Sequence, residues 1–296
     1  MNERKTLLVN LEEDCQLNCV FCQRNKYYNA NDKPTFRQIV SEIIFSDCET
    51  INFSGGGEPT RDKNLRKYIQ IAKKNGFNVL LETNGIALSD LKYFSDLVSC
   101  GLDKINLNVP SHCPKIYEKI VQTPGSFEKL NQALNHTFRF PGIIHAFTIP
   151  LTNINMSFKH FRGLFNFLSK FDSHASLLLS PFRPNDDSDL VKKYLPDYEE
   201  LGKNIVKILE FCKIKHRNIS ISNSIPFPLC KLKKFEKFAR IDMEYKTYYD
   251  FASLYTKFPE CQKCSLRKFC IGIPKEYLKM KKFVPEPFDH SWNSLH

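Results

Sequence analysis

The stretch TLLVNLEEDCQLNCVFC, residues 6–22, joins an apolar run to three closely spaced cysteines. The run TLLVNL is nearly continuous in hydrophobic residues, which favours a strand that is covered on both faces. Cys15, Cys19 and Cys22 follow it with the spacing C-x3-C-x2-C. A structural zinc site needs a fourth ligand, and none follows nearby, since the next histidine is His112. The spacing therefore favours a cubane 4Fe–4S cluster with one open iron, and zinc is the alternative.

Further apolar, β-rich runs recur along the chain, and each is followed by an amphipathic helical pattern. These runs are TINFSG (50–55), NVLLET (78–83), KINLNV (104–109), IHAFTIP (144–150) and SLLLSP (176–181). Six strand–helix units in sequence predict an α/β fold with a parallel sheet and right-handed crossovers. Because six units fall short of the eight in a closed barrel, we expect a partial (β/α)6 TIM-like barrel over residues 1–217.

In parallel α/β folds, functional residues collect at the carboxyl ends of the strands. The cysteines follow the first predicted strand, GGGEPT (55–60) follows the second, and TNG (83–85) follows the third. We therefore expect these three segments to lie close together.

The cysteine spacing, with Phe21 before the last cysteine and GGGEP after the second strand, resembles the radical S-adenosylmethionine (radical SAM) enzymes. The resemblance covers roughly residues 6–182. It implies that Cys15, Cys19 and Cys22 hold a 4Fe–4S cluster whose open iron is chelated by S-adenosylmethionine. In such enzymes the reduced cluster passes one electron to the sulfonium, and the resulting 5′-deoxyadenosyl radical abstracts a hydrogen from the substrate.

The same resemblance implies a set of residues around S-adenosylmethionine. These are Phe21, Gly56, Gly57, Glu58, Pro59, Asn84 and Asn108. Gly56 and Gly57 would present backbone groups to the methionine moiety, because glycine allows close approach. Asn84 lies in a TNG sequence that is also a common turn. Asn106 and Asn108 point the same way along the fourth strand, so either could reach the ribose or be satisfied by backbone groups. No residue is identified as a second catalytic acid, base or hydrogen donor.

A second cysteine group lies near the carboxyl end of the chain. CQKCSLRKFC gives Cys261-x2-Cys264-x5-Cys270, and Cys230 lies upstream in PLC. Four thiolates suit a structural zinc site as well as a cluster. In a radical SAM context the group resembles the SPASM and twitch extensions, which hold auxiliary 4Fe–4S clusters, and four cysteines match the one-cluster twitch arrangement. We therefore expect an auxiliary-cluster domain over residues 218–296, in which the cluster accepts or relays an electron.

The totals limit the remaining alternatives. The chain has 296 residues, eleven cysteines and a formal charge of +11. It has no apolar run long enough to span a membrane and no secretion signal, so we expect a cytoplasmic protein that holds metals rather than disulfides. The charge favours an anionic partner, such as an acidic peptide, RNA or a phosphorylated metabolite, although solvated lysines also serve solubility.

These features favour oxidative modification of a peptide or protein. Because the first strand begins near residue 6, we expect a separate protein to recognise the peptide. The resemblance also implies a reducing electron donor such as flavodoxin or ferredoxin.

Several alternatives remain. One is dehydrogenation or rearrangement of a small molecule such as an amino sugar, with Arg183 as an anion ligand or, more simply, a surface or ion-pair residue. RNA modification is another. A non-enzymatic alternative is a nucleic-acid-binding protein with structural metal, since CKLKKFEKFARIDMEYKTYYDFASLY (230–255) mixes basic and aromatic residues. The spacing of Phe235, Phe238, Ile241 and Tyr245 more simply predicts an amphipathic helix over the second cysteine group.

Overall fold

The structure is a computed structural model that describes residues 6–11, 14–22, 34–54, 56–222, 227–232, 234–235 and 253–288. The chain divides into two compact units. Unit 1 comprises residues 1–148 and 167–175, and unit 2 comprises residues 149–166 and 176–296. The predicted domain boundary near residue 217 remains a prediction. The helix predicted from Phe235 to Tyr245 lies, apart from Phe235, outside the described residues.

The described strands confirm the predicted fold class. Seven strands follow the chain order in one sheet, and every pairing with a defined register in it is parallel. Their bounds are β1 Thr6–Asn10, β2 Thr50–Ser54, β3 Asn78–Thr83, β4 Lys104–Asn108, β5 Ile144–Leu151, β6 Ser176–Pro181 and β7 Ile219–Ile221. The first six match the six apolar runs, so the architecture is a partial (β/α) barrel. The three-residue strand β7 was not predicted.

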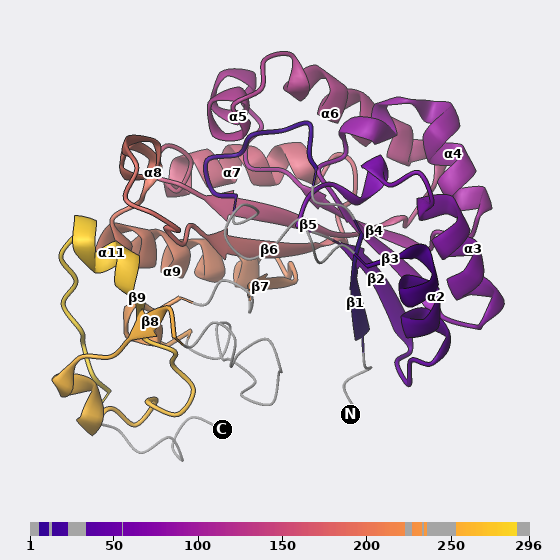
Figure 1. The fold of residues 1–296 in the computed structure, drawn as a ribbon. Coiled ribbons are helices and arrows are strands. Elements are labelled where there is room, and N and C mark those ends of the chain that lie inside the picture. Colours follow the sequence, from indigo (N-terminus) through magenta and orange to yellow (C-terminus); the bar gives the residue numbers. More distant parts are fainter. Residues whose placement is uncertain are drawn as a thin grey trace. The chain divides into compact units, whose positions relative to one another are not determined.

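The helices of unit 1 cover one face of its strands. They are α2 Phe36–Ile44, α3 Leu65–Lys74, α4 Leu91–Ser99, α5 Pro114–Val121 and α6 Ser126–His136. Figure 1 shows α2, α3 and α4 side by side along β1 to β4. Local sequence sets where two of them begin: Thr35 and Gln38 form a capping box at α2, and the Asp90 side chain caps α4.

The two faces of the strands in unit 1 differ in chemistry. The face toward the helices is apolar, and its residues are at most 1% exposed: Ile51, Phe53, Val79, Leu81, Ile105 and Leu107. The opposite face carries polar side chains in neighbouring positions, because Asn10 pairs with Ser54 and Glu82 pairs with Asn106. Side chains alternate along a strand, so these polar residues share one face.

Unit 2 contains the remaining elements. Beyond β6 and β7 these are α8 Asp189–Tyr194, α9 Tyr198–Ile214, the strand pair β8 Tyr255–Thr256 and β9 Ile273–Pro274, and α11 Lys275–Met280. The helix α7, Phe158–Leu168, runs across the division between the units in sequence. No helix among the described residues is long and apolar enough to cross a membrane.

Candidate functional site

The loop that carries the first cysteine group, residues 14–22, is fastened to the end of α5. The backbone N–H groups of Asn18 and Val20 donate to the carbonyl oxygens of Val121 and Ile120 at 3.1 and 2.9 Å. The last carbonyls of a helix have no partner within the helix. The loop therefore satisfies the end of α5, and α5 holds the loop in place.

Within this loop, sulfur and backbone atoms are hydrogen-bonded. The Sγ atom of Cys15 accepts from the backbone N–H of Leu17 at 3.4 Å and from the Nδ2 atom of Asn84 at 3.5 Å. The N–H of Cys22 donates to the carbonyl of Cys19 at 3.0 Å. The predicted site residue Asn84 thus lies against the first cysteine.

Glu58 joins the three segments that the sequence predicted to meet. Its Oε1 atom accepts from the hydroxyl groups of Thr60 and Thr83 at 2.7 and 2.6 Å, and its Oε2 atom accepts from the backbone N–H of Asn84 at 2.9 Å. Its own N–H donates to the carbonyl of Asp14 at 2.8 Å. GGGEPT, TNG and the cysteine loop are therefore brought together around one carboxylate.

The Glu58 side chain is buried, with the residue only 3% exposed. Burial raises the pKa of this carboxyl above its ordinary value, and the hydrogen bonds from Asn84, Thr83 and Thr60 act in the opposite direction. The backbone N–H of Thr60 also donates to Oε1 at 3.3 Å, so the carboxylate has four donors, and hydrogen bonds of this kind are what a buried carboxylate needs.

Other predicted site residues lie on the same elements. Gly56 and Gly57 are half-buried directly after β2, and Gly55 lies outside the described residues. Pro59 is buried and begins a short 3₁₀ helix, Pro59–Arg61. Phe21 is half-buried in the cysteine loop, and Asn108 is half-buried at the carboxyl end of β4.

A carboxylate on β3 was missed by the sequence analysis. The Glu82 carboxylate accepts from Asn52 Nδ2 at 2.9 Å and from Ser54 Oγ at 3.0 Å. The Oδ1 atoms of Asn52 and Asn106 are buried without a hydrogen-bond partner among the described residues. This face therefore offers several acceptors to a ligand with hydroxyl or ammonium donors. The available signal was one acidic residue inside the apolar run NVLLET.

Tyr117 on α5 was also missed. Its ring is fully buried, and its hydroxyl has no hydrogen-bond partner within the described part of the chain. Burial raises the pKa of Tyr117, and the nearby thiols of Cys19 and Cys15 and the carboxyl of Glu58 raise it further. An unpaired buried hydroxyl costs about 1–3 kcal/mol, so its position near the cysteines requires an explanation.

The second cysteine group lies in unit 2, and its four members line one small cavity of about 30 Å³. Cys230, Cys261, Cys264 and Cys270 share this cavity with apolar neighbours that include Leu229, Leu266, Pro285 and Pro287. The Sγ atom of Cys264 accepts from the backbone N–H of Phe288 at 3.5 Å. Burial raises the pKa of the Cys230 thiol to about 11. The predicted grouping of these cysteines is therefore present in space.

A buried lysine fixes the turn that carries Cys230. The Lys231 ammonium forms ion pairs with Glu199 on α9 and with Glu286, the latter at 2.7 Å. The turn approaches α9 closely at Gly202, where an added Cβ would stand 2.9 Å from the Lys231 carbonyl oxygen. The first turns of α9 thus hold the turn that carries Cys230 in place.

Single-ion coordination is not prepared at either cysteine group. Among the described residues, no group of three or more His, Cys, Asp or Glu side chains could hold one metal ion. A zinc ion draws four sulfurs to about 2.3 Å from one centre. A cubane cluster binds each thiolate through a different iron, so its ligands stand further apart. None of the eleven cysteines is in a disulfide.

Arg183 differs from the sequence expectation. It was expected to be a surface or ion-pair residue; the surface position is wrong, because Arg183 is only 3% exposed after β6, and the ion-pair role stays a prediction. Its positive charge acts on Tyr198, whose pKa it lowers against the larger opposing effect of burial. A buried guanidinium at a strand end is a candidate ligand for a carboxylate or phosphate group.

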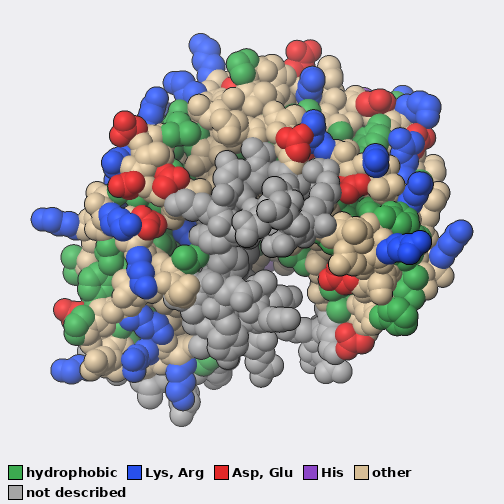
Figure 2. Space-filling view, in the orientation of Figure 1, with side chains coloured by type: hydrophobic (Ala, Val, Ile, Leu, Met, Phe, Trp, Pro, Cys, Tyr) green, Lys and Arg blue, Asp and Glu red, His purple; other side chains and the backbone are tan. Residues whose placement is uncertain are grey.

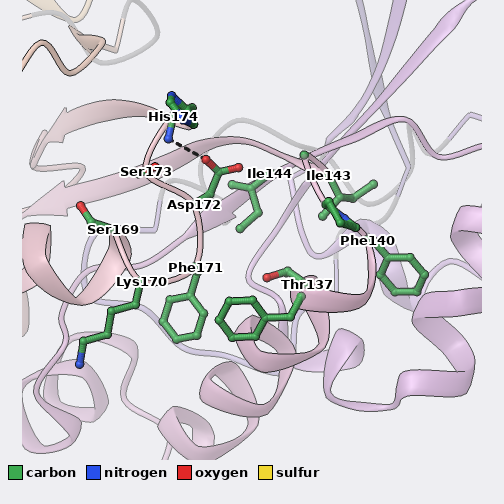
Figure 3. A pocket seen from close by; sticks show the side chains of 13 residues that line it. Thr137, Phe140, Ile143, Ile144, Ser169, Lys170, Phe171, Asp172, Ser173 and His174 are labelled. Atoms are coloured by element: carbon green, nitrogen blue, oxygen red, sulfur yellow. Dashed lines mark hydrogen bonds between the residues drawn. The ribbon is translucent and has the colours of Figure 1, made fainter.

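A further cavity lies at the opposite end of the strands in unit 1. It measures about 430 Å³ and is lined by residues 137–144 and 169–174, which include the start of β5. Figure 3 shows its aromatic side chains and the Asp172 carboxylate, which accepts from the backbone N–H of His174 at 2.7 Å. Because this end is opposite the carboxyl ends of the strands, the cavity is separate from the cysteine loop.

Comparison with known proteins shows which proteins this chain is similar to in sequence and in fold. The family model described as "Radical SAM superfamily" matches residues 9–159. A probable GTP 3′,8-cyclase of Methanococcus vannielii is 30% identical over 229 residues, which cover 74% of this chain. The chain spans 64% of that protein's length.

Among solved structures, native anSMEcpe with bound AdoMet and a Kp18Cys peptide superposes with a TM-score of 0.64 at 15% identity, over 95% of this chain and 91% of that one. SuiB of Streptococcus suis bound to its precursor peptide SuiA gives 0.62 at 16% identity, over 97% of this chain and 75% of that one. At these identities the likeness concerns the fold.

Proposed function

Because this chain belongs to the radical SAM superfamily, we propose that Cys15, Cys19 and Cys22 hold a 4Fe–4S cluster and that S-adenosylmethionine binds beside it. When bound, such a cluster supplies the electron that splits S-adenosylmethionine into methionine and a 5′-deoxyadenosyl radical, which takes a hydrogen atom from the substrate. The chain's own residues would hold the ligand and aim it.

The residues around the first cysteine group fit a cluster. Three thiolates are soft ligands that suit iron–sulfur centres. The backbone N–H of Leu17 and the side-chain amide of Asn84 already donate to Cys15 Sγ, as donors around cluster ligands do. The unpaired hydroxyl of Tyr117 would gain an acceptor from a sulfur-rich group beside Cys19.

The polar face of the strands fits S-adenosylmethionine. Gly56 and Gly57 carry no side chain that would block the backbone from the methionine moiety. Phe21 offers an aromatic face for adenine, and Asn84 and Asn108 offer amide groups at the strand ends. Glu82 adds acceptors for hydroxyl groups. Glu58 would act by positioning the neighbouring turns, because both of its carboxylate oxygens already accept hydrogen bonds within the protein. Pro59 starts the 3₁₀ helix that follows Glu58.

One observation carries the finer proposal: Cys230, Cys261, Cys264 and Cys270 line one cavity of unit 2. We propose that they hold an auxiliary 4Fe–4S cluster. Zinc is the alternative, since four thiolates also make a structural zinc set. A second redox centre suits a net oxidation, because a substrate radical must lose one more electron to become a closed-shell product.

The proposed reaction is therefore oxidative modification of a peptide or protein in the cytoplasm. The fold likeness to anSMEcpe with a bound peptide and to SuiB with its precursor peptide supports this substrate class. A reducing electron donor such as flavodoxin or ferredoxin, and a separate protein that recognises the peptide, belong to the same proposal.

A second candidate is a small anionic substrate such as a nucleotide. Buried Arg183 after β6 is suited to a phosphate or carboxylate, and the relative from Methanococcus vannielii is named as a probable GTP 3′,8-cyclase. Membership in a family of enzymes argues against the non-enzymatic alternative. RNA modification has no specific structural support.

Deuterium transfer distinguishes the two candidates. Iron-loaded protein is incubated under anaerobic conditions with S-adenosylmethionine, dithionite and a size-separated extract of deuterium-labelled cells. Mass spectrometry then locates the fraction that transfers deuterium into 5′-deoxyadenosine. Transfer from the peptide and protein fraction supports the first candidate. Transfer from the small-molecule fraction alone would replace it with the second, and Arg183→Gln should then abolish the signal.

A further inference from the structure

A groove in unit 2 combines an apolar floor with a basic rim. It measures about 580 Å³ and is lined by Phe258 and by the consecutive residues 278–284. The rings of Phe258 and Phe283 stack with centroids 6.0 Å apart. Val284 leaves 65% of its surface exposed, so the floor reaches the surface of the protein.

The charge of the groove is strongly one-sided. Its lining includes Lys279, Lys281 and Lys282 and no acidic residue. Lys279 pairs with Glu276 at 2.9 Å, whereas no acidic partner is recorded for Lys281 or Lys282 among the described residues. Residues 253–288 hold eight Lys and Arg and three Glu. Figure 2 shows basic side chains gathered over the part of the molecule that Figure 1 draws in orange and yellow.

This groove adjoins the cavity of the second cysteine group. The carbonyl of Phe258 accepts from the N–H of Cys261 at 3.0 Å, at the start of the 3₁₀ helix Pro259–Lys263. At the other wall, Val284 lines the groove and the next three residues, 285–287, line the cysteine cavity. Two chain segments therefore form walls of both spaces.

We infer that this groove docks a small acidic electron-transfer protein. The inference rests on the proposed function, because the electron that the substrate radical gives to the second cluster must leave through a one-electron carrier before the next turnover. The charge fits an acidic surface, and the shared walls would bring the carrier next to the proposed second cluster. Electron-transfer complexes bury small interfaces and depend on charge complementarity, which suits an apolar patch rimmed by unpaired lysines.

Binding of oxidised flavodoxin, an acidic carrier, to the iron-loaded full chain tests this surface without turnover. The dissociation constant is measured by calorimetry at several salt concentrations for wild type and for Lys281→Glu/Lys282→Glu. The matched control is Lys203→Glu/Lys207→Glu, which changes the charge equally on exposed positions of α9. We expect the groove variant to bind roughly tenfold more weakly and with a flatter salt dependence, and the control to resemble wild type.

A separate variant tests the contribution of the apolar floor of the groove to binding. Val284→Asp places a charge on an exposed residue without disturbing the core, and we expect it to weaken flavodoxin binding as well. Equal binding by wild type and both groove variants, in samples that form 5′-deoxyadenosine with dithionite, would overturn the docking surface and leave the proposed function intact.

A decameric glutamate peptide identifies the competing occupant. If it binds wild type through Lys281 and Lys282 while flavodoxin does not bind, the groove takes acidic peptides and the docking inference is wrong. Iron-loaded wild type that forms no 5′-deoxyadenosine but still binds flavodoxin at the groove would contradict the proposed function instead.

Discussion

Asn84 is held between a carboxylate and a sulfur: its backbone N–H donates to Glu58 at 2.9 Å, and its side-chain amide donates to Cys15 Sγ at 3.5 Å. The first hydrogen bond fixes the turn after β3 against the turn after β2. The second brings the same residue to the cysteine loop. Under the proposed function, Glu58 would therefore act as a positioning residue that holds the backbone of Asn84 beside the cysteines.

Replacing the Glu58 carboxylate by an amide should destabilise the fold. In Glu58→Gln, whichever way the amide is turned, one donor from Asn84, Thr60 or Thr83 faces an NH₂ group instead of an oxygen. We expect the free energy of unfolding to fall by about 1–3 kcal/mol, the cost of an unsatisfied buried group. Urea unfolding of the cluster-free protein measures it, with Glu210→Gln on an exposed position of α9 as the control. An unchanged midpoint for Glu58→Gln would contradict the proposed positioning role.

Removing the hydroxyl of Tyr117 should change the stability of the protein differently without and with the cluster. Without a cluster, Tyr117→Phe removes an unpaired buried hydroxyl, so the variant should be more stable than wild type by about 1–3 kcal/mol. With the cluster bound, we expect the hydroxyl to donate a hydrogen bond to it, so the gain should shrink or reverse. The midpoint potential of the cluster should also become more negative, since donors to cluster sulfur favour the reduced state.

Unfolding of the cluster-free and iron-loaded proteins, with an electrochemical titration, measures both effects of Tyr117→Phe. Tyr198→Phe is the matched control, because its hydroxyl donates to the Phe182 carbonyl at 2.7 Å and its loss should destabilise both states. The same gain for Tyr117→Phe with and without iron, at an unchanged potential, would show that the hydroxyl does not reach the cluster.

Gly202 should be needed for the second cysteine group. In Gly202→Ala the new Cβ would stand 2.7 Å from the Cβ of Lys231, so the turn that carries Cys230 must move. Overpacking of this kind costs about 1–3 kcal/mol, which exceeds the roughly 1 kcal/mol that alanine gains in helix propensity. When Gly202→Ala is combined with replacement of Cys15, Cys19 and Cys22 by Ala, only the second group can hold iron, and the iron content should fall below about four atoms per chain. The control, Lys203→Ala, should keep its iron. Full iron occupancy in Gly202→Ala would show that the close approach of Gly202 to Lys231 is not needed for the second cysteine group.

Removing one ligand of the second group separates its two proposed roles. In Cys264→Ala we expect iron to fall from about eight to about four atoms per chain, while dithionite still drives cleavage of S-adenosylmethionine. Product should be lost, and the substrate radical should instead be reduced back. A variant that is folded by circular dichroism and limited proteolysis, and makes product at the normal rate, would remove the electron-accepting role.

The strands and their order were predictable because each strand is a nearly continuous apolar run. The runs NVLLET and SLLLSP match β3 and β6 residue for residue, and the four other runs match within one residue at each end. β7 escaped because its three residues are too short to form a pattern. That the cysteine loop, GGGEPT and TNG meet was also predictable, since parallel strands share one carboxyl edge.

The missed residues depend on contacts that no local pattern records. Glu82 lies inside an apolar run, so the sequence did not single it out. Its place on the polar face is seen only from the hydrogen bonds that Asn52 and Ser54 on the neighbouring strand donate to it. Tyr117 reads as an ordinary apolar position of α5, because only the docking of the cysteine loop brings its hydroxyl near Cys19. As a lone arginine, Arg183 was expected to be a surface or ion-pair residue, and the structure excludes the surface position because the residue is buried.

The most direct test of the central claim is formation of 5′-deoxyadenosine by the protein reconstituted with iron and sulfide under anaerobic conditions. Chromatography with mass spectrometry measures it after addition of S-adenosylmethionine and dithionite. We predict formation by wild type and by Cys48→Ala, a cysteine outside both groups, and none by Cys19→Ala. Absence of 5′-deoxyadenosine in iron-loaded wild type, or equal amounts from Cys19→Ala, would contradict the assignment of Cys15, Cys19 and Cys22 as the site of radical formation.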